Sequence, residues 1–187
     1  MAKRFSQIEP VQQDFIARQK VFFVATAAAD GRVNVSPKGA DSLRVMGPNR
    51  VLWLNLTGSG NETAAHLLQN DRMTLMFCAF EGDPLILRLY GQARTVQPDH
   101  PQWSALLAHF PQLPGARQIY DLHVDLVQTS CGFAVPFFDY VGERQQLNEW
   151  AEKKGPDGVR QYWHDRNRES LDGFPTGMPD NLPAMND

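Results

Sequence analysis

The chain has 187 residues, enough for one domain with a buried core and too few for two domains of ordinary size. Its formal net charge of -3 and its lack of any Lys/Arg run argue against nucleic acid or an anionic membrane as the main partner, since both need a concentrated basic face. The N-terminal region lacks the basic start and apolar centre of a signal peptide, and no apolar run is long enough to cross a bilayer, so we expect a cytoplasmic protein.

The first half of the chain predicts a helix followed by antiparallel strands. Residues 10–20 are expected to form the helix, and residues 21–26 and 32–36 a hairpin around the tight-turn pair Asp30-Gly31. Residues 42–46 and 50–56 make a second strand pair across a Gly-Pro-Asn turn. A helix over 61–69 follows, and the S-x-x-E pattern that ends at Glu62 predicts a capping box at its start.

The second half predicts three further strands and three helices. The strands are expected at 73–80, 85–96 and 119–129, and the helices at 101–110, 142–153 and 158–167. Residues 171–187 contain Gly, Pro and Asn without periodicity and are interpreted as a tail. Short antiparallel strands at this spacing favour a barrel, because closure removes exposed strand edges.

These elements define an α+β fold, mainly β with helices. We expect a single domain over residues 1–187, with a barrel core at 20–140 and a helical C-terminal extension with the tail at 141–187.

Two segments could bind an anion, and each has a structural alternative. Lys38 follows a strand at a sharp bend, where it could face an anionic ligand or lie in a solvated turn. Residues 55–63 run from a strand through a Gly-rich loop into a helix, whose free amides favour a phosphate. Alternatively, Ser59 and Glu62 cap each other in this loop, and the carboxylate of Glu62 would repel a phosphate.

Arg88 and an aromatic segment are two further candidates. Arg88 is a lone cation in an apolar strand, so it needs either an internal carboxylate or a ligand phosphate as a partner. The aromatic residues between 133 and 140 could wall an aromatic cofactor, bury a subunit interface or belong to the core. Cys78 and Cys131 are interpreted as buried free thiols. The sequence contains no metal-ligand spacing and no hydrolase or dinucleotide-binding motif, so we expect no metal site.

Taken together, these segments resemble the pyridoxamine 5'-phosphate oxidase-like FMN-binding split-barrel family, as an uncharacterised branch rather than the authentic oxidase. The similarity extends over about residues 22–96. It rests on Phe23–Thr26, Asp30–Gly39, Val51–Asn55, Arg72–Phe77 and Leu87–Gly91. The resemblance implies an antiparallel split barrel that binds FMN, a small-molecule substrate, and a homodimer with the flavin site at the subunit interface.

By position, the resemblance also implies which residues bind the cofactor. The isoalloxazine, ribityl chain and phosphate would contact Asn34, Val35, Ser36, Lys38, Leu54, Asn55, Thr57, Asn61, Glu62, Thr63 and Arg88. Authentic oxidases carry an Arg-Lys pair where this chain has Glu62 and Thr63, and an arginine where it has Val33. Phosphate anchoring is therefore the point at which this chain departs from the family pattern.

The resulting hypothesis is an FMN-dependent oxidoreductase of unknown substrate, in which FMN supplies the reactive centre. No residue stands out as an obligatory acid or base, and Lys38 is the expected cation near the reacting end of the flavin. The alternatives are a non-catalytic flavin- or haem-binding protein and an F420-dependent reductase on the same barrel.

Overall fold

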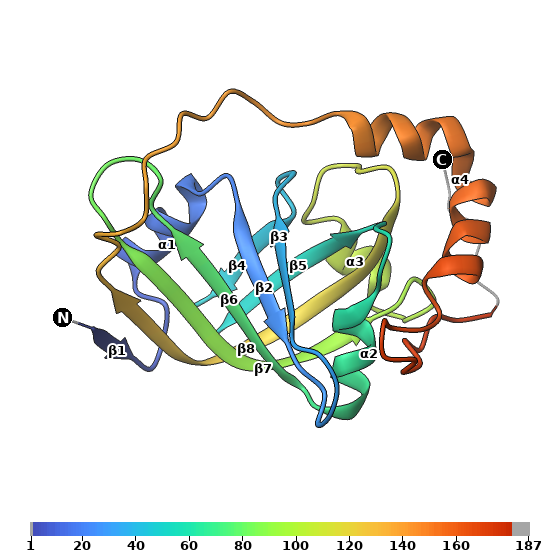
Figure 1. The fold of residues 1–187 in the computed structure, drawn as a ribbon, viewed down its shortest axis with the longest axis horizontal. Coiled ribbons are helices and arrows are strands. Elements are labelled where there is room, and N and C mark those ends of the chain that lie inside the picture. The colour runs from blue at the N-terminus through green and yellow to red at the C-terminus, as the bar shows by residue number, and fades with distance from the viewer. Residues whose placement is uncertain (1, 181–187) are drawn as a thin grey trace.

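The computed structural model describes residues 2–180, so the last part of the expected tail, residues 181–187, lies outside the described residues. This part of the chain forms one antiparallel sheet with helices around it (Figure 1). The strands are β1 (Lys3–Phe5), β2 (Phe22–Thr26), β3 (Asn34–Lys38), β4 (Leu43–Gly47), β5 (Arg50–Leu56), β6 (Arg72–Cys78), β7 (Ile86–Val96) and β8 (Ala116–Ser130). The helices are α1 (Pro10–Arg18), α2 (Glu62–Gln69), α3 (Trp103–Leu107) and α4 (Gln146–Arg166).

The strand order makes the sheet a split barrel. The order is β3-β2-β6-β7-β8-β5-β4, with β1 added to β8, and every pairing is antiparallel. The two outermost strands, β3 and β4, are separated in sequence by only residues 39–42, so the sheet must curl until its ends approach each other. No ladder joins β3 to β4 in the described chain. The mainly β fold with a split between these strands confirms the expected class.

The core follows the two-residue alternation of the strands. In β2, β6 and β7, every second side chain points inward, and Val24, Leu75 and Leu89 are fully buried. β7 and β8 approach so closely at Gly91 that a Cβ there would lie 1.9 Å from the carbonyl oxygen of His123. A bulge occurs at this point of the ladder, so the glycine permits the bend that curls the sheet.

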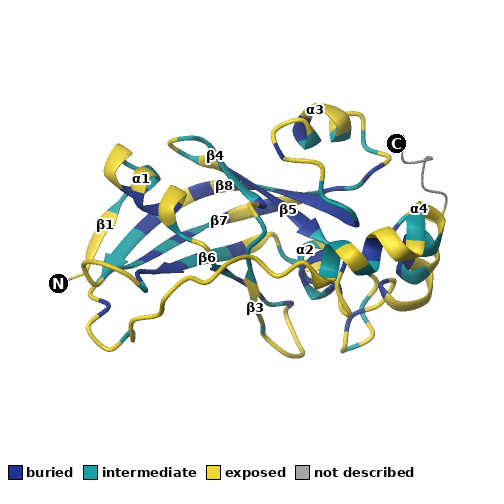
Figure 2. Cartoon of the chain, turned by 90° about the horizontal axis from the view of Figure 1, so that it is seen from above, coloured by how far each residue is buried: buried dark blue, intermediate teal, exposed yellow. Residues whose placement is uncertain are grey.

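A second apolar layer covers the other side of β5 and β8. Leu52, Leu54 and Ile119 pack against Leu106 and Phe110 from the α3 region. The central residues of β5 are therefore buried on both faces, which fixes the position of this strand in the sheet. Figure 2 shows the buried residues concentrated in these strands, while the connection from β8 to α4 is largely exposed.

Several local expectations are corrected by the structure. Asp30 and Gly31 lie in a loop over residues 27–33 rather than in a two-residue turn, since the last paired residues are Thr26 and Asn34. The capping box does not form, because Asn61 is the N-cap of α2 and makes no side-chain cap bond. Cys78 is buried as expected, but Cys131 is exposed, because it follows the end of β8 and leaves the sheet.

The C-terminal extension folds as a bent helix after a long connection. The two expected helices join into α4, which begins four residues later than expected and is broken at Gly155, where φ is 67°. The end of α4 contacts the loop before α2 through Trp163 and Thr57, and the residues that follow α4 contact the same loop and the start of α2 (Figure 1). The strand β1 was not expected, since three residues carry no periodic signal. None of the described helices is both long and apolar enough to span a membrane.

Candidate functional site

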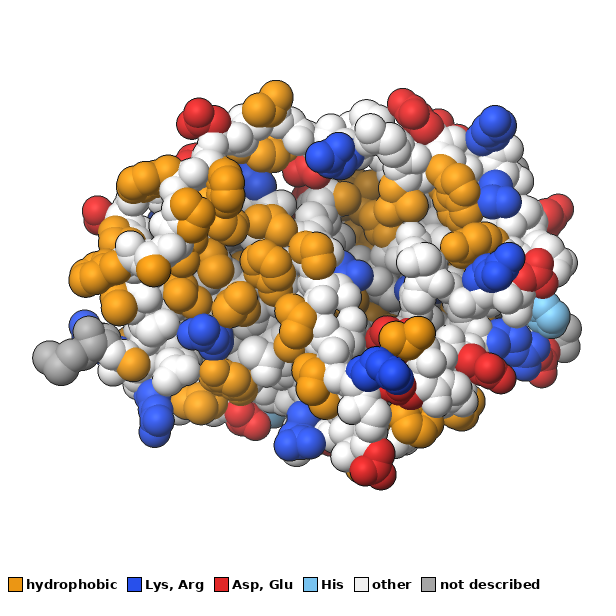
Figure 3. All heavy atoms as spheres, viewed as in Figure 1, with side chains coloured by type: hydrophobic (Ala, Val, Ile, Leu, Met, Phe, Trp, Pro, Cys, Tyr) orange, Lys and Arg blue, Asp and Glu red, His pale blue; other side chains and the backbone are white. Residues whose placement is uncertain are grey.

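A cavity of about 750 Å³ lies at the split of the barrel. Its walls come from the ends of β3 and β5, and the connection between β8 and α4 passes over it. Figure 3 shows this hollow below that connection, with basic side chains inside it. Because the split separates two strands that no ladder joins, the fold itself creates the opening.

The turn between β3 and β4 forms one edge of the cavity. Ala40 and Asp41 both adopt a left-handed backbone, with φ of 58° and 51°, which is uncommon for residues with a Cβ. The Ser42 hydroxyl donates to the Gly39 carbonyl at 2.6 Å, and the Asp41 carboxylate pairs with Arg44 at 2.7 Å. These contacts stabilise a strained turn, a feature that clusters at binding sites.

Lys38 is the cation that lies deepest on the β3 side of the cavity. It shares the inward row of β3 with Asn34 and Ser36, and its Nζ lies 5.2 Å from the centroid of the Trp53 ring. Burial, together with the smaller effect of the nearby charge of Arg117, lowers the pKa of Lys38 from 10.5 to about 8. Lys38 is therefore charged at neutral pH but only weakly stabilised in that form.

The wall behind Lys38 is polar and buried. Asn55 Nδ2 donates to Gln118 Oε1 at 3.3 Å, and the Tyr120 hydroxyl donates to the same oxygen at 3.2 Å. Tyr120 stacks on Trp53 with ring centroids 4.7 Å apart, and burial raises the pKa of its hydroxyl. Within the described residues, Gln118 Nε2 is buried and has no hydrogen-bond partner. This wall thus holds a hydrogen-bond donor that none of the described residues satisfies.

Arg117 lies next to this wall and is only 2% exposed. Its Nη1 donates to the Gly60 carbonyl at 3.1 Å and to Asn167 Oδ1 at 2.6 Å. Nε has no partner, and no carboxylate pairs with Arg117, among residues 2–180. Burial lowers the pKa of Arg117 to about 10, so it stays protonated at neutral pH.

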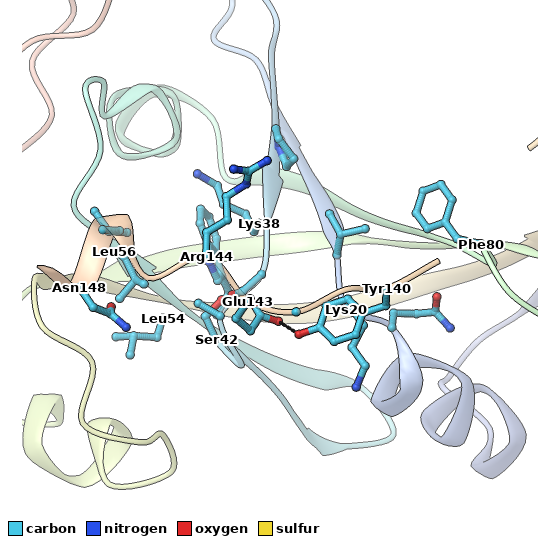
Figure 4. A pocket seen from close by; sticks show the side chains of 18 of the residues that line it. Lys20, Lys38, Ser42, Leu54, Leu56, Phe80, Tyr140, Glu143, Arg144 and Asn148 are labelled. Atoms are coloured by element: carbon cyan, nitrogen blue, oxygen red, sulfur yellow. Dashed lines mark hydrogen bonds between the residues drawn. The ribbon is translucent and has the colours of Figure 1, made fainter. Parts of the chain in front are cut away.

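The aromatic segment after β8 divides between two sides. Phe138 and Tyr140 line the cavity, whereas Phe133 and Phe137 point outward and are 83% and 78% exposed. Tyr140 donates its hydroxyl to Glu143 Oε1 at 2.8 Å, a contact drawn in Figure 4. In the same view, Lys20, Lys38 and Arg144 surround the cavity from three elements. The cavity therefore combines aromatic walls with four basic and three acidic side chains.

The start of α2 does not suit a phosphate. The Glu62 carboxylate accepts a hydrogen bond from the Leu171 backbone N–H at 3.0 Å, and Asn61 Nδ2 donates to the Asn167 carbonyl at 3.2 Å. Glu62 and Glu169 both line a shallow hollow of about 550 Å³ beside the loop. The C-terminal segment thus contacts the helix start, and two carboxylates would repel an anion there.

The structure divides the eleven residues expected to bind the cofactor into three groups. Lys38, Leu54, Asn55 and Thr57 lie together around the large cavity. Asn34, Val35, Ser36, Asn61, Glu62 and Thr63 lie at or near the shallow hollow, where Asn34 Nδ2 donates to Thr63 Oγ1 at 3.3 Å and Ser36 donates to Asn34. Arg88 lies on the outer face of the sheet, half-buried, with its Nη1 3.2 Å from the Ser130 hydroxyl.

Sequence reasoning missed Arg117, Trp163 and Asn167. Trp163 donates its indole N–H to Thr57 Oγ1 at 2.7 Å, and Asn167 Nδ2 donates to the Gly58 carbonyl at 3.1 Å. These contacts dock α4 on the loop that ends the cavity wall. The strand expected from the sequence begins at residue 119, which leaves Arg117 in the preceding loop. No local sequence pattern marks Trp163 or Asn167.

Comparisons with known proteins agree with this fold. Residues 8–131 match the family model described as Pyridoxamine 5'-phosphate oxidase. The pyridoxamine 5'-phosphate oxidase family protein ustO of Aspergillus flavus is 36% identical over 181 residues, covering 87% of this chain and 73% of ustO. The chain therefore belongs to the pyridoxamine 5'-phosphate oxidase family.

Solved structures support the same fold at lower identity. Two structures of HupZ from Group A Streptococcus are similar to this chain, with TM-scores of 0.54 and 0.52 and identities of 21% and 22%. The similarity covers 66% and 64% of this chain, and 99% and 91% of the HupZ chains. The family model ends at residue 131, where the connection over the cavity begins, so α4 and its contacts lie beyond the matched region.

Proposed function

We propose that this protein binds FMN in the large cavity and is an FMN-dependent oxidoreductase that acts on a small molecule. The observation that carries the proposal is the cavity at the split, which combines aromatic walls with Lys38 in a member of this family. Its volume of about 750 Å³ lies within the range of about 300–1,000 Å³ that is usual for ligand sites.

Different residues around the cavity suit the conjugated ring of FMN and its phosphate. Trp53, Phe138 and Tyr140 supply flat apolar surface for a conjugated ring, and the unsatisfied donor of Gln118 lies behind the wall. The phosphate does not fit at Glu62 and the start of α2, for the electrostatic reason given above. An anionic group fits better near Lys38, which has no carboxylate partner among the described residues.

When bound, FMN would supply the hydride chemistry, and the residues of the chain would bind, orient and shield it. Lys38 would hold a positive charge against the ligand and favour its anionic forms. The connection over the cavity would limit the access of water. No acid or base need be assigned to the chain for this role.

We also propose that the protein works as a homodimer, with the outer face of the sheet as the contact. This face carries two cross-strand rows of half-buried or exposed side chains, and Figure 3 shows hydrophobic side chains gathered over β2, β6 and β7. The rows are Val35, Ala25, Thr74, Tyr90, Leu126 and Pro37, Phe23, Met76, Arg88, Gln128. Exposed apolar area of this kind marks interaction surfaces, and a second copy would cover it and bring Arg88 into the assembly.

Titration with FMN tests the cofactor. We expect the flavin spectrum to shift and its fluorescence to change on binding, and Lys38→Met to weaken binding or slow flavin reduction. Lys153→Met is a matched control, since Lys153 is exposed and outside the cavity lining. Equal binding and reduction by all three proteins would remove Lys38 from the site. A Soret band in the purified protein would indicate haem, and selective binding of F420 would indicate the deazaflavin reductase.

The substrate and the assembly need separate measurements. For an FMN-loaded enzyme, we expect oxidation of NAD(P)H or of another small donor, whereas a loaded protein with no turnover would be a flavin carrier. Sedimentation would report a dimer, and Val35→Asp should dissociate it, because a charge would enter the apolar face. A monomeric wild type would refute the dimer.

A further inference from the structure

Behind one wall of the cavity lies a buried charge that has no counter-charge among residues 2–180. The Arg117 guanidinium is 2% exposed, and its partners are the Gly60 carbonyl and the Asn167 amide oxygen, both of which are neutral. A buried guanidinium is costly unless a carboxylate or an anionic ligand compensates it. The chain therefore maintains a positive charge here that its described residues do not neutralise.

The position of Arg117 connects this charge to the cavity. Gly60, which accepts from Arg117, belongs to the same short loop as Thr57 and Gly58, and both of these line the cavity. From the other side of the cavity, Lys38 is near enough for the charge of Arg117 to disfavour its protonated form. Two positive groups thus flank the same inner end, and neither has a carboxylate partner within the described chain.

Asn167 determines whether the charge stays free. Its side chain accepts from Arg117 and donates to the Gly58 carbonyl at 3.1 Å, and the residue is fully buried. An aspartate has nearly the same shape and would form an ion pair with Arg117. The amide at this position therefore holds the guanidinium in place without cancelling its charge.

We propose that Arg117 is a positioning residue whose free charge, together with Lys38, makes the inner end of the cavity a seat for an organic phosphate, and that Asn167 keeps this charge available. The inference rests on the proposed function for its choice of ligand, because FMN carries such a phosphate. The same chemistry could come from a phosphorylated substrate. In either case the seat replaces the start of α2, where Glu62 excludes an anion.

Other charged groups also face this region. Arg18 is the last residue of α1, Lys20 lies between α1 and β2, and Glu81 comes from the connection between β6 and β7. The segment over the cavity contributes Asp139, Glu143 and Arg144, while Tyr120 and Tyr162 lie near Arg117. Tyr140 and Glu143 are hydrogen-bonded to each other, so that carboxylate is partly engaged. The pKa of Lys38 must therefore be compared only between the wild type and variants that keep all these groups.

Asn167→Asp and Asn167→Ser form the test pair. Both remove the hydrogen bond from Nδ2 to Gly58, but only the aspartate neutralises Arg117. We expect Asn167→Asp to lower the affinity for FMN about tenfold relative to the affinity for riboflavin, which lacks the phosphate, and Asn167→Ser to leave this ratio unchanged. If the ratio is unchanged but inorganic phosphate binds the FMN-loaded wild type better than FMN-loaded Asn167→Asp, the seat serves a substrate phosphate.

The titration of Lys38 provides a readout without flavin. Its apparent pKa, followed by the pH dependence of lysine acylation in mass spectrometry, should rise in Asn167→Asp and stay unchanged in Asn167→Ser. Inorganic phosphate should raise it in the wild type and protect Lys38 from acylation. A wild type that binds no flavin would refute the proposed function, yet these measurements would still decide about the seat. Absence of the phosphate effect in the wild type, or equal behaviour of the two variants in every readout, would overturn the inference.

Discussion

Lys38→Met should make the folded protein more stable at neutral pH, because the wild type holds a charge in a largely desolvated site. The folded pKa of about 8 lies below the unfolded value of 10.5, so the unfolded chain holds this proton more tightly. Below about pH 8 both states are protonated, and the folded state carries the full cost of the charge. As the pH rises from about 8 to 10.5, only the unfolded state keeps the proton, and the wild type gains stability relative to the variant.

The size of the effect follows from the same two values. A pKa lowered from 10.5 to about 8 corresponds to about 3 kcal/mol. The contact between Lys38 Nζ and the Trp53 ring offsets about 1 kcal/mol of this cost. We therefore expect Lys38→Met to raise the free energy of unfolding by about 2 kcal/mol near neutral pH, and this gain to shrink between about pH 8 and 10.5.

Urea unfolding at a fixed protein concentration, repeated across this pH range, measures the difference. Lys153→Met serves as the control, since removal of an exposed lysine should change stability little at any pH. A difference between wild type and Lys38→Met that does not depend on pH would refute the assignment of a desolvated charge to Lys38. A strongly destabilised variant would do the same.

Three further predictions concern the parts that support the cavity. Trp163→Phe should lower the free energy of unfolding by about 1 kcal/mol and expose α4 to limited proteolysis, because the bond to Thr57 is lost; unchanged cleavage would contradict the docking. Asp121→Asn should lose about 1 kcal/mol at neutral pH, since two arginines pair with this carboxylate. Because the folded pKa of Asp121 lies below the usual 3.8, this loss should shrink as the pH falls below 3.8 and vanish below the folded pKa, and acid unfolding measures it. Truncation before Ser170 removes the hydrogen bond from the Leu171 backbone to Glu62 and should change FMN affinity, measured by titration, or dimer stability, measured by sedimentation. A truncated protein that is normal in both measurements would contradict this prediction.

The sequence predicts the barrel because alternation is a local signal. The strands that contain Val24, Leu75 and Leu89 read as half-buried or apolar runs, and the structure places them in the sheet as expected. Lys38 was also placed correctly at a strand end beside a bend. In these cases the physical cause, a two-residue period or a turn, lies within a few residues of its effect.

The supporting contacts could not be predicted, because they join distant segments. Arg117 meets Asn167 across 50 positions, and Asn167 meets Gly58 across 109. Neither Arg117 nor Asn167 belongs to a local sequence pattern that would indicate its partner. Glu62 is predicted from the local sequence to cap the helix, whereas its carboxylate accepts a hydrogen bond from the distant backbone N–H of Leu171. Arg88 read as a buried cation, but the register of β7 turns it to the outer face.

The central claim is that the cavity at the split of the barrel holds FMN. An absorbance spectrum of the purified protein, before and after addition of FMN, with the released cofactor identified by mass, tests it most directly. We predict a flavin spectrum and the mass of FMN, either as purified or after loading. A colourless protein whose spectrum matches that of free FMN after mixing would contradict the account.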